Sequence, residues 1–238
     1  MNTLITGTSR GLGLTIAKTL IEEGHTVYAI SRTIGDLEKL KATNPDQVHH
    51  LSYDLSNLDD IKQIIFKDWL NGVEIHSFVN NAAMAYDTLL TNMDADKVLK
   101  MTKVNQLTPM LLTKYVIRNM LLHDVTGSIV HISSISAHTG YKGLSMYAAT
   151  KGALEAFSKN TAREWGVKGI RSNCVACGFM ETEMTDMMDD KTKQKVYNRT
   201  ALKAPTSLES AAQTVVFLLS DKAVSITGEV MHVDGGTI

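Results

Sequence analysis

A tyrosine and a lysine four residues apart, Tyr147 and Lys151, are the side chains in this sequence best suited to transfer a proton. They open a segment with helical character, where positions i and i+4 fall on one face and hold the phenol near the ammonium. A free tyrosine titrates near ~10, and a nearby cation lowers that pKa by favouring the phenolate. The pair therefore suits proton transfer near neutral pH, although this spacing is also common in solvent-exposed pairs.

A glycine-rich turn, containing Gly7, Gly11 and Gly13, follows the first apolar run of the chain and precedes an amphipathic stretch. Glycine permits positive φ and lets the backbone come close to a pyrophosphate, whose charge is met by the amides at the start of the next helix. The turn therefore predicts a dinucleotide site. The alternative is a strand-helix turn that binds no ligand.

The residues near the end of the second apolar run indicate which dinucleotide is bound. Enzymes that use NAD usually have an acidic residue about 20 positions beyond the turn, where it holds the ribose 2′-hydroxyl. This sequence has Ser31 and Arg32 there instead, and Arg10 lies in the glycine turn. Because two guanidinium groups suit a 2′-phosphate, we expect NADP(H) rather than NAD(H). The alternative is that both arginines are solvated surface residues.

The elements that must position these residues alternate along the chain. Short apolar runs typical of strands occupy residues 3–6, 27–30, 49–53, 77–79, 128–132, 172–175 and 229–233. Amphipathic stretches typical of helices lie at 14–22, 58–70, 110–122, 146–165 and 208–219. The alternation predicts an α/β fold, a single Rossmann-like doubly wound domain over residues 1–238 with a seven-stranded parallel sheet and helices on both faces. A segment at about 179–205 departs from the alternation and is expected to form a substrate lid.

Charge and cysteine content exclude several classes of function. The 24 basic and 25 acidic residues are interspersed to a net charge of -1, which leaves no basic stripe for nucleic acid. No apolar run reaches membrane-spanning length and the chain opens on a strand without a cleavable leader, so we expect a cytoplasmic protein with no membrane partner. Cys174 and Cys177 have the spacing of a redox pair or of half a zinc site, but two buried reduced thiols are favoured and no metal is expected.

The motifs stand in the order of a known family. The turn at 6–13 is followed by Asn-Asn-Ala-Ala at 80–83, then by Asn105, Ser134, and Tyr147 with Lys151. On these residues the sequence resembles the short-chain dehydrogenase/reductase family over essentially its whole length. The segments at 178–184 and 226–236 are similar to those of 3-oxoacyl-[acyl-carrier-protein] reductases.

This resemblance implies four catalytic residues. Tyr147 gives or takes the proton, Lys151 lowers the pKa of Tyr147 and holds the nicotinamide ribose, Ser134 hydrogen-bonds the substrate oxygen, and Asn105 holds a water in the proton relay. The roles agree with elementary chemistry, because a carbonyl oxygen that gains negative charge on hydride arrival is stabilised by hydroxyl donors and then protonated. No metal is required for this reaction.

The resemblance also implies a set of cofactor contacts. Asp54 and Leu55 would touch the adenine, Asn80 and Ala82 would line the cofactor, and Thr182 would meet the carboxamide, although Asn80 and Asn81 are also suited to capping a strand end. The complete expected set of cofactor-binding residues is Gly7, Ser9, Arg10, Gly11, Leu12, Gly13, Ser31, Arg32, Asp54, Leu55, Asn81, Ala82, Ala83, Tyr147, Lys151, Gly178, Met180 and Thr182.

Two residues depart from the family pattern. Ala83 stands where the family usually has glycine, which adds a methyl group to a flexible position. Cys177 stands where proline usually precedes Gly178, and proline would fix φ in the loop beside the nicotinamide. We expect a small local adjustment at Ala83 and consider Cys177 a candidate site of oxidation or alkylation.

Three functions are compatible with these observations. The first is an NADPH-dependent reductase of 3-oxoacyl thioesters, linked to acyl carrier protein or coenzyme A, in fatty acid or polyketide biosynthesis. The second is a dehydrogenase or reductase for another alcohol or ketone, such as a sugar, a steroid or a secondary metabolite. The third is a sensor that binds NADP without turnover, against which the four catalytic residues argue.

The expected partners follow from the same resemblance. The lid contains Phe179 and a set of methionines that would either line an acyl pocket or simply pack: Met180, Met184, Met187 and Met188. An acidic carrier protein would require basic residues at the mouth of the site, for which Lys142, Lys168 and Lys203 are candidates unless they are ordinary surface lysines. The family also implies a homotetramer, or a homodimer, packed through residues 101–122 and 146–165, whose apolar stripes are equally compatible with a buried core.

Overall fold

A seven-stranded parallel sheet forms the centre of the molecule in the computed structural model, which describes residues 1–182 and 188–238. The strands run in the order β3-β2-β1-β4-β5-β6-β7, and each neighbouring pair is parallel. Their bounds are β1 Asn2–Thr6, β2 Thr26–Ser31, β3 Val48–Ser52, β4 Ser77–Asn80, β5 Ser128–Ser134, β6 Arg171–Cys177 and β7 Val230–Val233. The predicted α/β class, the doubly wound topology and the number of strands are confirmed.

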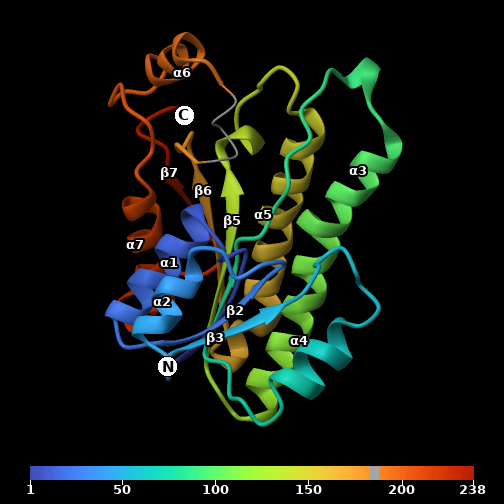
Figure 1. Cartoon of the computed structure of the whole chain (residues 1–238), viewed down its shortest axis with the longest axis vertical. Coiled ribbons are helices and arrows are strands. Elements are labelled where there is room, and N and C mark those ends of the chain that lie inside the picture. Colours follow the sequence, from blue (N-terminus) through green and yellow to red (C-terminus); the bar gives the residue numbers. More distant parts are fainter. Residues whose placement is uncertain (183–187) are drawn as a thin grey trace.

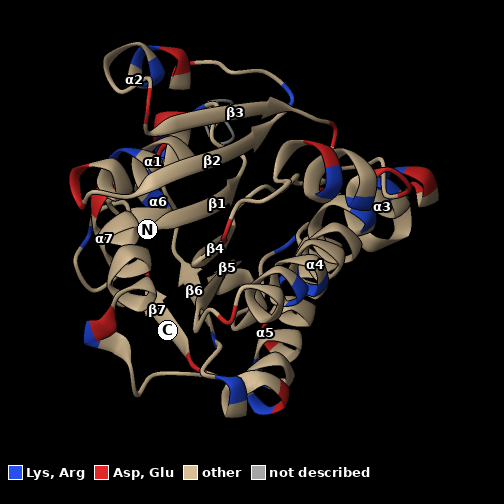
Figure 2. Cartoon of the chain, turned by 90° about the horizontal axis from the view of Figure 1, so that it is seen from below, with Lys and Arg blue, Asp and Glu red and all other residues tan. Residues whose placement is uncertain are grey.

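Helices cover both faces of the sheet, and the two groups lie on opposite sides of it in Figures 1 and 2. One face packs against α1 (Gly11–Glu22), α2 (Leu37–Thr43) and α7 (Leu208–Leu219). The other packs against the π-helix η1 (Ile61–Trp69), α4 (Thr108–Leu122) and the long α5 (Ser145–Trp165). The remaining helices are α3 (Ala95–Thr102), the π-helical turn η3 (Lys103–Leu107), α6 (Asp190–Tyr197) and the short η2 (Leu90–Asn92), η4 (Ile135–Ala137), η5 (Gly166–Lys168) and η6 (Asp221–Ala223).

The two hydrophobic cores arise from side-chain alternation along the strands. In β1, Leu4 and Ile5 are both fully buried but point to opposite faces of the sheet. Ile5 packs with α1 and α7, whereas Leu4 packs with η1 and α4. A strand buried on both faces is apolar without interruption, as expected for a parallel sheet.

Strand β5, which lies next to the central β4, extends beyond its apolar run. The pattern predicts a strand over 128–132, but pairing with β6 continues through Ser133↔Ala176 and Ser134↔Cys177. Hydrogen bonding to β6 on one side satisfies the backbone of these two polar residues, so the ladder continues after the apolar run has ended. Ser134 is thereby held at the carboxyl edge of the sheet, where ligands of doubly wound folds bind.

Charged residues of both signs decorate the outer helices, whereas the strands are nearly free of them (Figure 2). Basic and acidic residues are mixed on α2, α3 and α5. Within the described part of the chain, no helix combines the length and the apolar character needed to cross a membrane.

Candidate active site

Ser134 and Tyr147 meet at the carboxyl edge of the sheet, one at the end of β5 and the other in the first turn of α5. The Ser134 Oγ accepts hydrogen bonds from the Ser136 backbone N (3.2 Å) and from the Ser136 Oγ (3.0 Å). A serine hydroxyl has one proton and two lone pairs. Because Ser136 occupies the lone pairs, the Ser134 proton is available for donation toward Tyr147 and toward an oxygen bound beside it.

Lys151 lies one helical turn beyond Tyr147 and is almost completely buried, with 3% of its surface exposed. Its Nζ donates a hydrogen bond to the Ile132 carbonyl on β5 (2.7 Å) and lies 5.6 Å from the centroid of the Tyr147 ring. Burial lowers the pKa of Lys151 to about 8. The ammonium is therefore anchored to β5 and positioned close to the phenol.

The electrostatic environment of Tyr147 differs from the expectation that Lys151 lowers its pKa. Burial raises the pKa of the phenol above its ordinary value, the neighbouring Cys177 raises it further, and a hydrogen bond with Ser134 lowers it in part. The Lys151 ammonium donates to the Ile132 carbonyl, and it faces the ring of Tyr147. The phenol in this structure is accordingly a protonated acid, which is the form that can donate a proton to a substrate oxygen.

Asn105 is buried in the π-helical turn η3, between α3 and α4. Its Oδ1 accepts from the Met84 backbone N (2.9 Å), and its Nδ2 donates to the Met84 carbonyl (2.9 Å) and to the Thr150 Oγ1 (3.1 Å). Single turns of π-helix often occur at functional sites. Here the turn directs Asn105 onto α5 beside Lys151 and fixes the chain after β4 to that helix.

The glycine turn is held together by the end of β4. Asn81 donates from Nδ2 to the carbonyls of Thr6 (2.9 Å) and Gly7 (3.0 Å), and the Thr6 Oγ1 accepts from the backbone N of Asn81 and of Ala82. Gly7 has φ of +75°, and a Cβ on Gly13 would lie 2.1 Å from the Gly7 carbonyl oxygen. Glycine is therefore required at both positions for conformation and for close packing.

Ala83 directly follows Asn81 and Ala82, and its backbone is not strained. Its φ is negative, whereas the only described non-glycine residues with positive φ are Asp124 and Lys203. A methyl group is compatible with such a backbone, which explains why alanine is tolerated where the family usually has glycine.

The two turns that contain Arg10 and Arg32 are in contact. The backbone N of Asp36, in the loop after β2, donates to the Ser9 carbonyl in the glycine turn (2.9 Å). Both arginines are exposed at this edge of the sheet. The Ser31 Oγ is directed elsewhere, because it contacts the Thr33 carbonyl (2.8 Å) and the His50 Nε2 (2.9 Å).

Several other expected cofactor residues lie at the same carboxyl edge. Asp54 and Leu55 directly follow β3, and the Asp54 carboxylate accepts from the Ser56 backbone N (2.9 Å). That hydrogen bond lowers the pKa of Asp54, with a smaller contribution from Arg32. Thr182 approaches the glycine turn from the loop after β6, since a Cβ on Gly11 would lie 3.6 Å from its Cγ2.

The residues that fold into the glycine turn suit a dinucleotide. The Thr8 Oγ1 is buried and has no hydrogen-bond partner among the described residues, while Gly11 has open space around it and a Cβ there would meet only Thr182, at 3.6 Å. Gly11 and Leu12 are the first two residues of α1, whose first amides lack partners within the helix. An unpaired hydroxyl and free helical amides are donors suited to a pyrophosphate.

Cys177 and Cys174 are buried free thiols on β6, as predicted. Three positions apart on a strand, they point to opposite faces of the sheet, so they do not form a pair. The Cys174 Sγ contacts the Leu154 carbonyl and the Cys177 Sγ contacts the Val175 carbonyl. Burial raises the pKa of each thiol to about 12, which makes Cys177 a poor target for oxidation or alkylation.

The segment after β6 starts with Gly178, where a Cβ would lie 2.4 Å from the Thr206 Oγ1. Phe179 packs against the Tyr197 ring (5.9 Å between centroids), and Tyr197 donates a hydrogen bond to Glu181, which connects the start of the segment to α6. Met180 packs partly buried against the core beside α1. Met184 and Met187 lie outside the described residues, and Met188 precedes α6.

One of the three lysines expected at the mouth of the site is elsewhere. Lys168 lies in η5, beyond the far end of α5, whereas Tyr147 is in the first turn of that helix. A helix of 21 residues separates them, which corresponds to about 30 Å. Helical spacing alone excludes Lys168 from the mouth; Lys142 and Lys203 are exposed and lie on the loops before α5 and after α6.

Two side chains beside the catalytic set were not among the expected residues. Glu155 is buried one turn beyond Lys151, and it accepts hydrogen bonds from Ser133 and from the His138 Nε2 (2.9 Å). The spacing of positions 147, 151 and 155 places Glu155 on the same helix face, a signal already present in the sequence. His138 lies in a loop and has no such periodic signal.

These features define the class of the protein. A parallel doubly wound sheet presents, at one edge, a glycine turn suited to a dinucleotide and a serine, a tyrosine and a lysine suited to proton transfer. The sequence profile described as "Enoyl-(Acyl carrier protein) reductase" matches residues 7–237. The chain belongs to the short-chain dehydrogenase/reductase family, and it is an NAD(P)-dependent oxidoreductase acting on CH-OH groups of small molecules.

Known proteins resemble the chain over its whole length. The 3-oxoacyl-[acyl-carrier-protein] reductase FabG of Buchnera aphidicola subsp. Acyrthosiphon pisum is 34% identical over 232 residues, which are 98% of this chain and 95% of the relative. A gluconate 5-dehydrogenase from Burkholderia cenocepacia, solved with NADP and tartrate, has a TM-score of 0.92 at 26% identity and covers 99% of this chain and 94% of its own. A 4-hydroxyisoleucine dehydrogenase complexed with NADH and succinate has a TM-score of 0.89 at 25% identity, covering 99% and 98%.

Proposed function

We propose that this protein is an NADPH-dependent ketoreductase that reduces a 3-oxoacyl thioester to the 3-hydroxyacyl form. The observation that carries the proposal is the meeting of Ser134 and Tyr147 over the buried Lys151, since two hydroxyl donors suit a carbonyl oxygen. Similarity to FabG over 98% of the chain supports the 3-oxoacyl thioester as the substrate class. When it is bound, the nicotinamide cofactor would supply the hydride for this reduction.

Each of the four residues has a role that follows from its contacts. Ser134 donates its free proton to the substrate oxygen, and Tyr147, which burial keeps protonated, transfers its proton to that oxygen. Lys151 supplies positive charge and holds the ribose of the cofactor. Asn105, bonded to Met84 and Thr150, positions the first turns of α5 and holds a water that leads protons to the site.

The choice of NADP(H) over NAD(H) rests on Arg10 and Arg32, which belong to two turns in mutual contact. Solved relatives bind either nucleotide: one was determined with NADP and another with NADH. A guanidinium binds a phosphate through parallel charge-assisted hydrogen bonds, so two arginines at this edge favour the 2′-phosphate. The remaining expected cofactor residues complete the same binding surface.

The segment at 179–205 is proposed to act as the substrate lid of a single NADP-binding domain that spans residues 1–238. Its described part includes Met180, Met188 and Phe179, which packs against Tyr197 of α6, and it keeps Lys203 exposed. Apolar side chains suit an acyl chain, and Lys142 with Lys203 would suit the acidic surface of an acyl carrier protein. Coenzyme A thioesters are alternative substrates.

The corresponding pathway is fatty acid or polyketide biosynthesis in the cytoplasm. The two reduced thiols are compatible with this reducing compartment.

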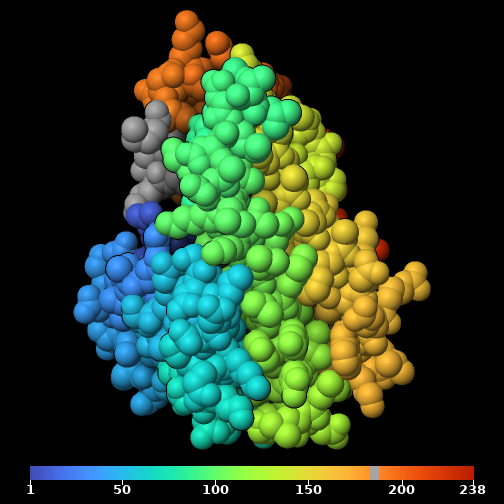
Figure 3. Space-filling model, turned by 90° about the vertical axis from the view of Figure 1, so that its right-hand side faces the viewer, coloured from blue at the N-terminus to red at the C-terminus, as the bar shows by residue number. Residues whose placement is uncertain are grey.

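A homotetramer, or a homodimer, is proposed to form through the face that contains α3, α4 and α5 (Figure 3). This face has exposed large apolar side chains on three successive elements: Leu99 on α3, Leu107 in η3, and Leu121 with Leu122 on α4. Association through this face would remove these apolar side chains from water.

A second candidate function is the oxidation or reduction of another alcohol or ketone, such as a sugar, a steroid or a secondary metabolite. The TM-score of 0.92 to a gluconate 5-dehydrogenase supports it, because the same scaffold then accepts a small polar substrate. A non-catalytic NADP-binding sensor is the weakest candidate, since the full catalytic set is present.

The test is the oxidation of NADPH by the purified protein with acetoacetyl and longer 3-oxoacyl thioesters, and with free ketones alongside. We expect thioester turnover, and we expect Tyr147→Phe to reduce kcat by about 10²–10⁴-fold while NADPH binding is retained, because only the proton donor is removed. Turnover of free ketones alone would favour the second candidate. A Tyr147→Phe variant with near-normal kcat would refute the assignment of the acid.

A further inference from the structure

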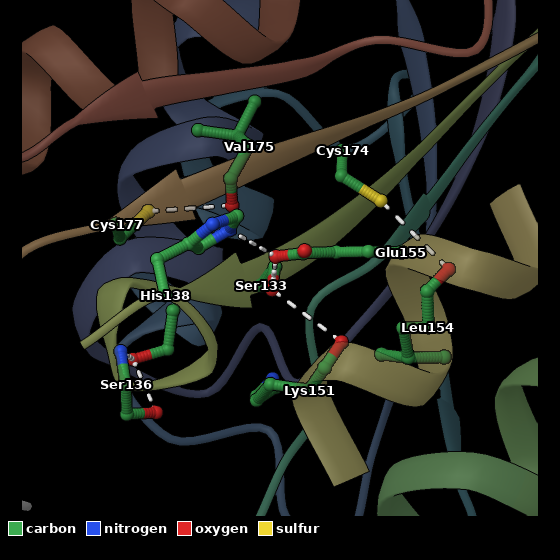
Figure 4. A network of polar contacts seen from close by, with 10 residues as sticks. Ser133, Ser136, His138, Lys151, Leu154, Glu155, Cys174, Val175 and Cys177 are labelled. Atoms are coloured by element: carbon green, nitrogen blue, oxygen red, sulfur yellow. Dashed lines mark hydrogen bonds and ion pairs between the residues drawn. The ribbon is translucent and has the colours of Figure 1, made fainter. Parts of the chain in front are cut away.

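A second polar cluster, made of Ser133, His138 and Glu155, lies beside Lys151 (Figure 4). The Glu155 Oε1 accepts hydrogen bonds from the Ser133 hydroxyl and from the His138 Nε2 (2.9 Å). Glu155 is buried, with 8% of its surface exposed. The His138 ring also packs edge-on against His232 of β7, with 4.5 Å between centroids.

The cluster connects the two elements that carry the catalytic hydroxyls. Ser133 immediately precedes Ser134 on β5, and Glu155 lies one turn beyond Lys151 on α5. The Ser133 Oγ also lies 3.5 Å from the Lys151 carbonyl. The spacing between Ser134 and Tyr147 is therefore set by contacts behind them, because neither strand nor helix can shift without breaking the bond between Ser133 and Glu155.

The same cluster brings a negative charge to the vicinity of Lys151. Burial lowers the pKa of Lys151, whereas Cys177, Cys174 and Glu155 each raise it. The thiols have pKa values of about 12 and are uncharged near neutral pH. Glu155 is the one carboxyl group among these three neighbours of Lys151.

Other titratable groups near the cluster lie on β5, on α5 itself and on the elements beside Glu155. His131 of β5 is buried, and burial lowers its pKa to about 3, so it is neutral. Tyr147 on α5 itself is a protonated phenol. Asn105 and Thr150, at the contact of η3 with α5, are uncharged. The groups on the side of Glu155 include His138, His232 and, beside Cys174, Lys159.

We propose that Glu155 is a positioning residue for proton transfer: with Ser133 and His138 it fixes β5 to α5 behind Ser134, and it places a carboxyl group one helical turn beyond Lys151. The inference rests on the proposed ketoreductase function. It gives a role in catalysis to Glu155, Ser133 and His138, which contact neither the reacting carbonyl nor the glycine turn.

Two substitutions separate charge from geometry. Glu155→Gln keeps the size of the side chain and the oxygen that Ser133 and His138 bond, but it removes the negative charge. Ser133→Ala removes the hydroxyl and leaves the charge in place. Glu155→Asp restores the charge as a conservative variant, and Glu164→Gln, at an exposed position on the same helix, is the matched control.

The kcat of each variant is measured from pH 6 to pH 10 on the ketone that the wild type reduces best. For Glu155→Gln we expect the high-pH loss of kcat to move to lower pH by about one unit, with the KM for NADPH changed less than about twofold because no cofactor contact is lost. Glu155→Asp should bring the profile back toward that of the wild type. Ser133→Ala should lower kcat at all pH values without moving the profile, and Glu164→Gln should match the wild type.

The titration of Lys151 provides a readout that needs no turnover. The ¹⁵N resonance of its side chain, assigned with Lys151→Arg, is followed against pH in the wild type and in Glu155→Gln, whose midpoint we expect to be lower. Equal midpoints together with superimposable kcat profiles would overturn the inference. Should the wild type reduce no ketone, the proposed function fails while the midpoints still test the role of Glu155. Should Glu155→Gln not fold, Ser133→Ala is compared with the wild type instead, and an unchanged kcat in that variant would contradict the inference.

Discussion

The Lys151 ammonium donates a 2.7 Å hydrogen bond to the Ile132 carbonyl, two residues before Ser134 on the same strand. A residue of the helix α5 is thereby anchored to the strand that carries the other half of the catalytic set. The bond also compensates a buried ammonium for part of its lost hydration. The position of Lys151 therefore depends on β5 as much as on its own helix.

The buried Lys151 should make stability depend on pH in a characteristic way. Its pKa in the folded protein is about 8, against an ordinary value of 10.5, so the unfolded chain binds more protons between these two values. The free energy of unfolding of the wild type should then rise with pH over this range, whereas Lys151→Met has no such contribution. At pH 7 we expect Lys151→Met to have a higher free energy of unfolding than the wild type. This difference should shrink by about 3 kcal/mol as the pH rises toward 10.5. Urea unfolding of both proteins across pH measures this; a difference that stays constant would contradict it.

The close contact at Gly13 should make this position intolerant of a methyl group. A Cβ there would lie 2.1 Å from the Gly7 carbonyl oxygen, whereas a Cβ on Gly152 in α5 meets only Ala137 at 3.9 Å. Gly13→Ala should destabilise the protein by about 1–3 kcal/mol or more and weaken NADPH binding. Gly152→Ala, the matched control, should stabilise it by about 0.5–1 kcal/mol. Equal thermal unfolding temperatures for the two variants would refute the packing argument.

Arg32 should determine the preference for the phosphorylated cofactor. Arg32→Ala removes a guanidinium whose charge-assisted bonds are worth about 1.5–3 kcal/mol, so the KM for NADPH should rise by about 10–100-fold. The KM for NADH should hardly change, since it has no 2′-phosphate. Arg163→Ala, an exposed arginine on α5, serves as the control. A loss of equal size with both nucleotides would show that Arg32 does not read the phosphate.

Cys177 should be inert in the folded protein. Burial raises the pKa of its thiol to about 12, from an ordinary 9.0, and almost none of its surface is exposed. Iodoacetamide at pH 8 should leave Cys177 unmodified and activity intact, while the unfolded chain is alkylated at both cysteines. Mass spectrometry of the native protein that finds rapid modification of Cys177 would contradict this expectation.

The apolar pattern was sufficient to predict the sheet, because strands buried on both faces need continuous apolar runs. Residues 133 and 134 of β5 are polar and owe their strand conformation to pairing with Ala176 and Cys177. The apolar pattern did not indicate α2, α3 and α6. These are short helices of seven or eight residues with at most one buried side chain each, so they lack a sustained apolar stripe.

The candidate site was predictable where chemistry and spacing coincide, as for Tyr147 with Lys151. Glu155 continues the same spacing but was overlooked, since a carboxylate on a helix is usually solvated. His138 and Met84 were beyond sequence reasoning, because only the folded loops bring them to Glu155 and Asn105. The direction of the Tyr147 pKa also required the structure, because burial outweighs the other contributions there.

The most direct test of the central claim follows a deuterium label from NADPH to product. The wild-type protein is given deuterated NADPH, carrying the transferable label at C4 of the nicotinamide, with an equal mixture of a 3-oxoacyl thioester and the corresponding 2-enoyl thioester. We predict a 3-hydroxyacyl thioester with deuterium at C3, formed from the ketone, while the enoyl thioester stays unchanged. A saturated labelled thioester formed from the enoyl substrate, with the 3-oxoacyl thioester left intact, would contradict the account.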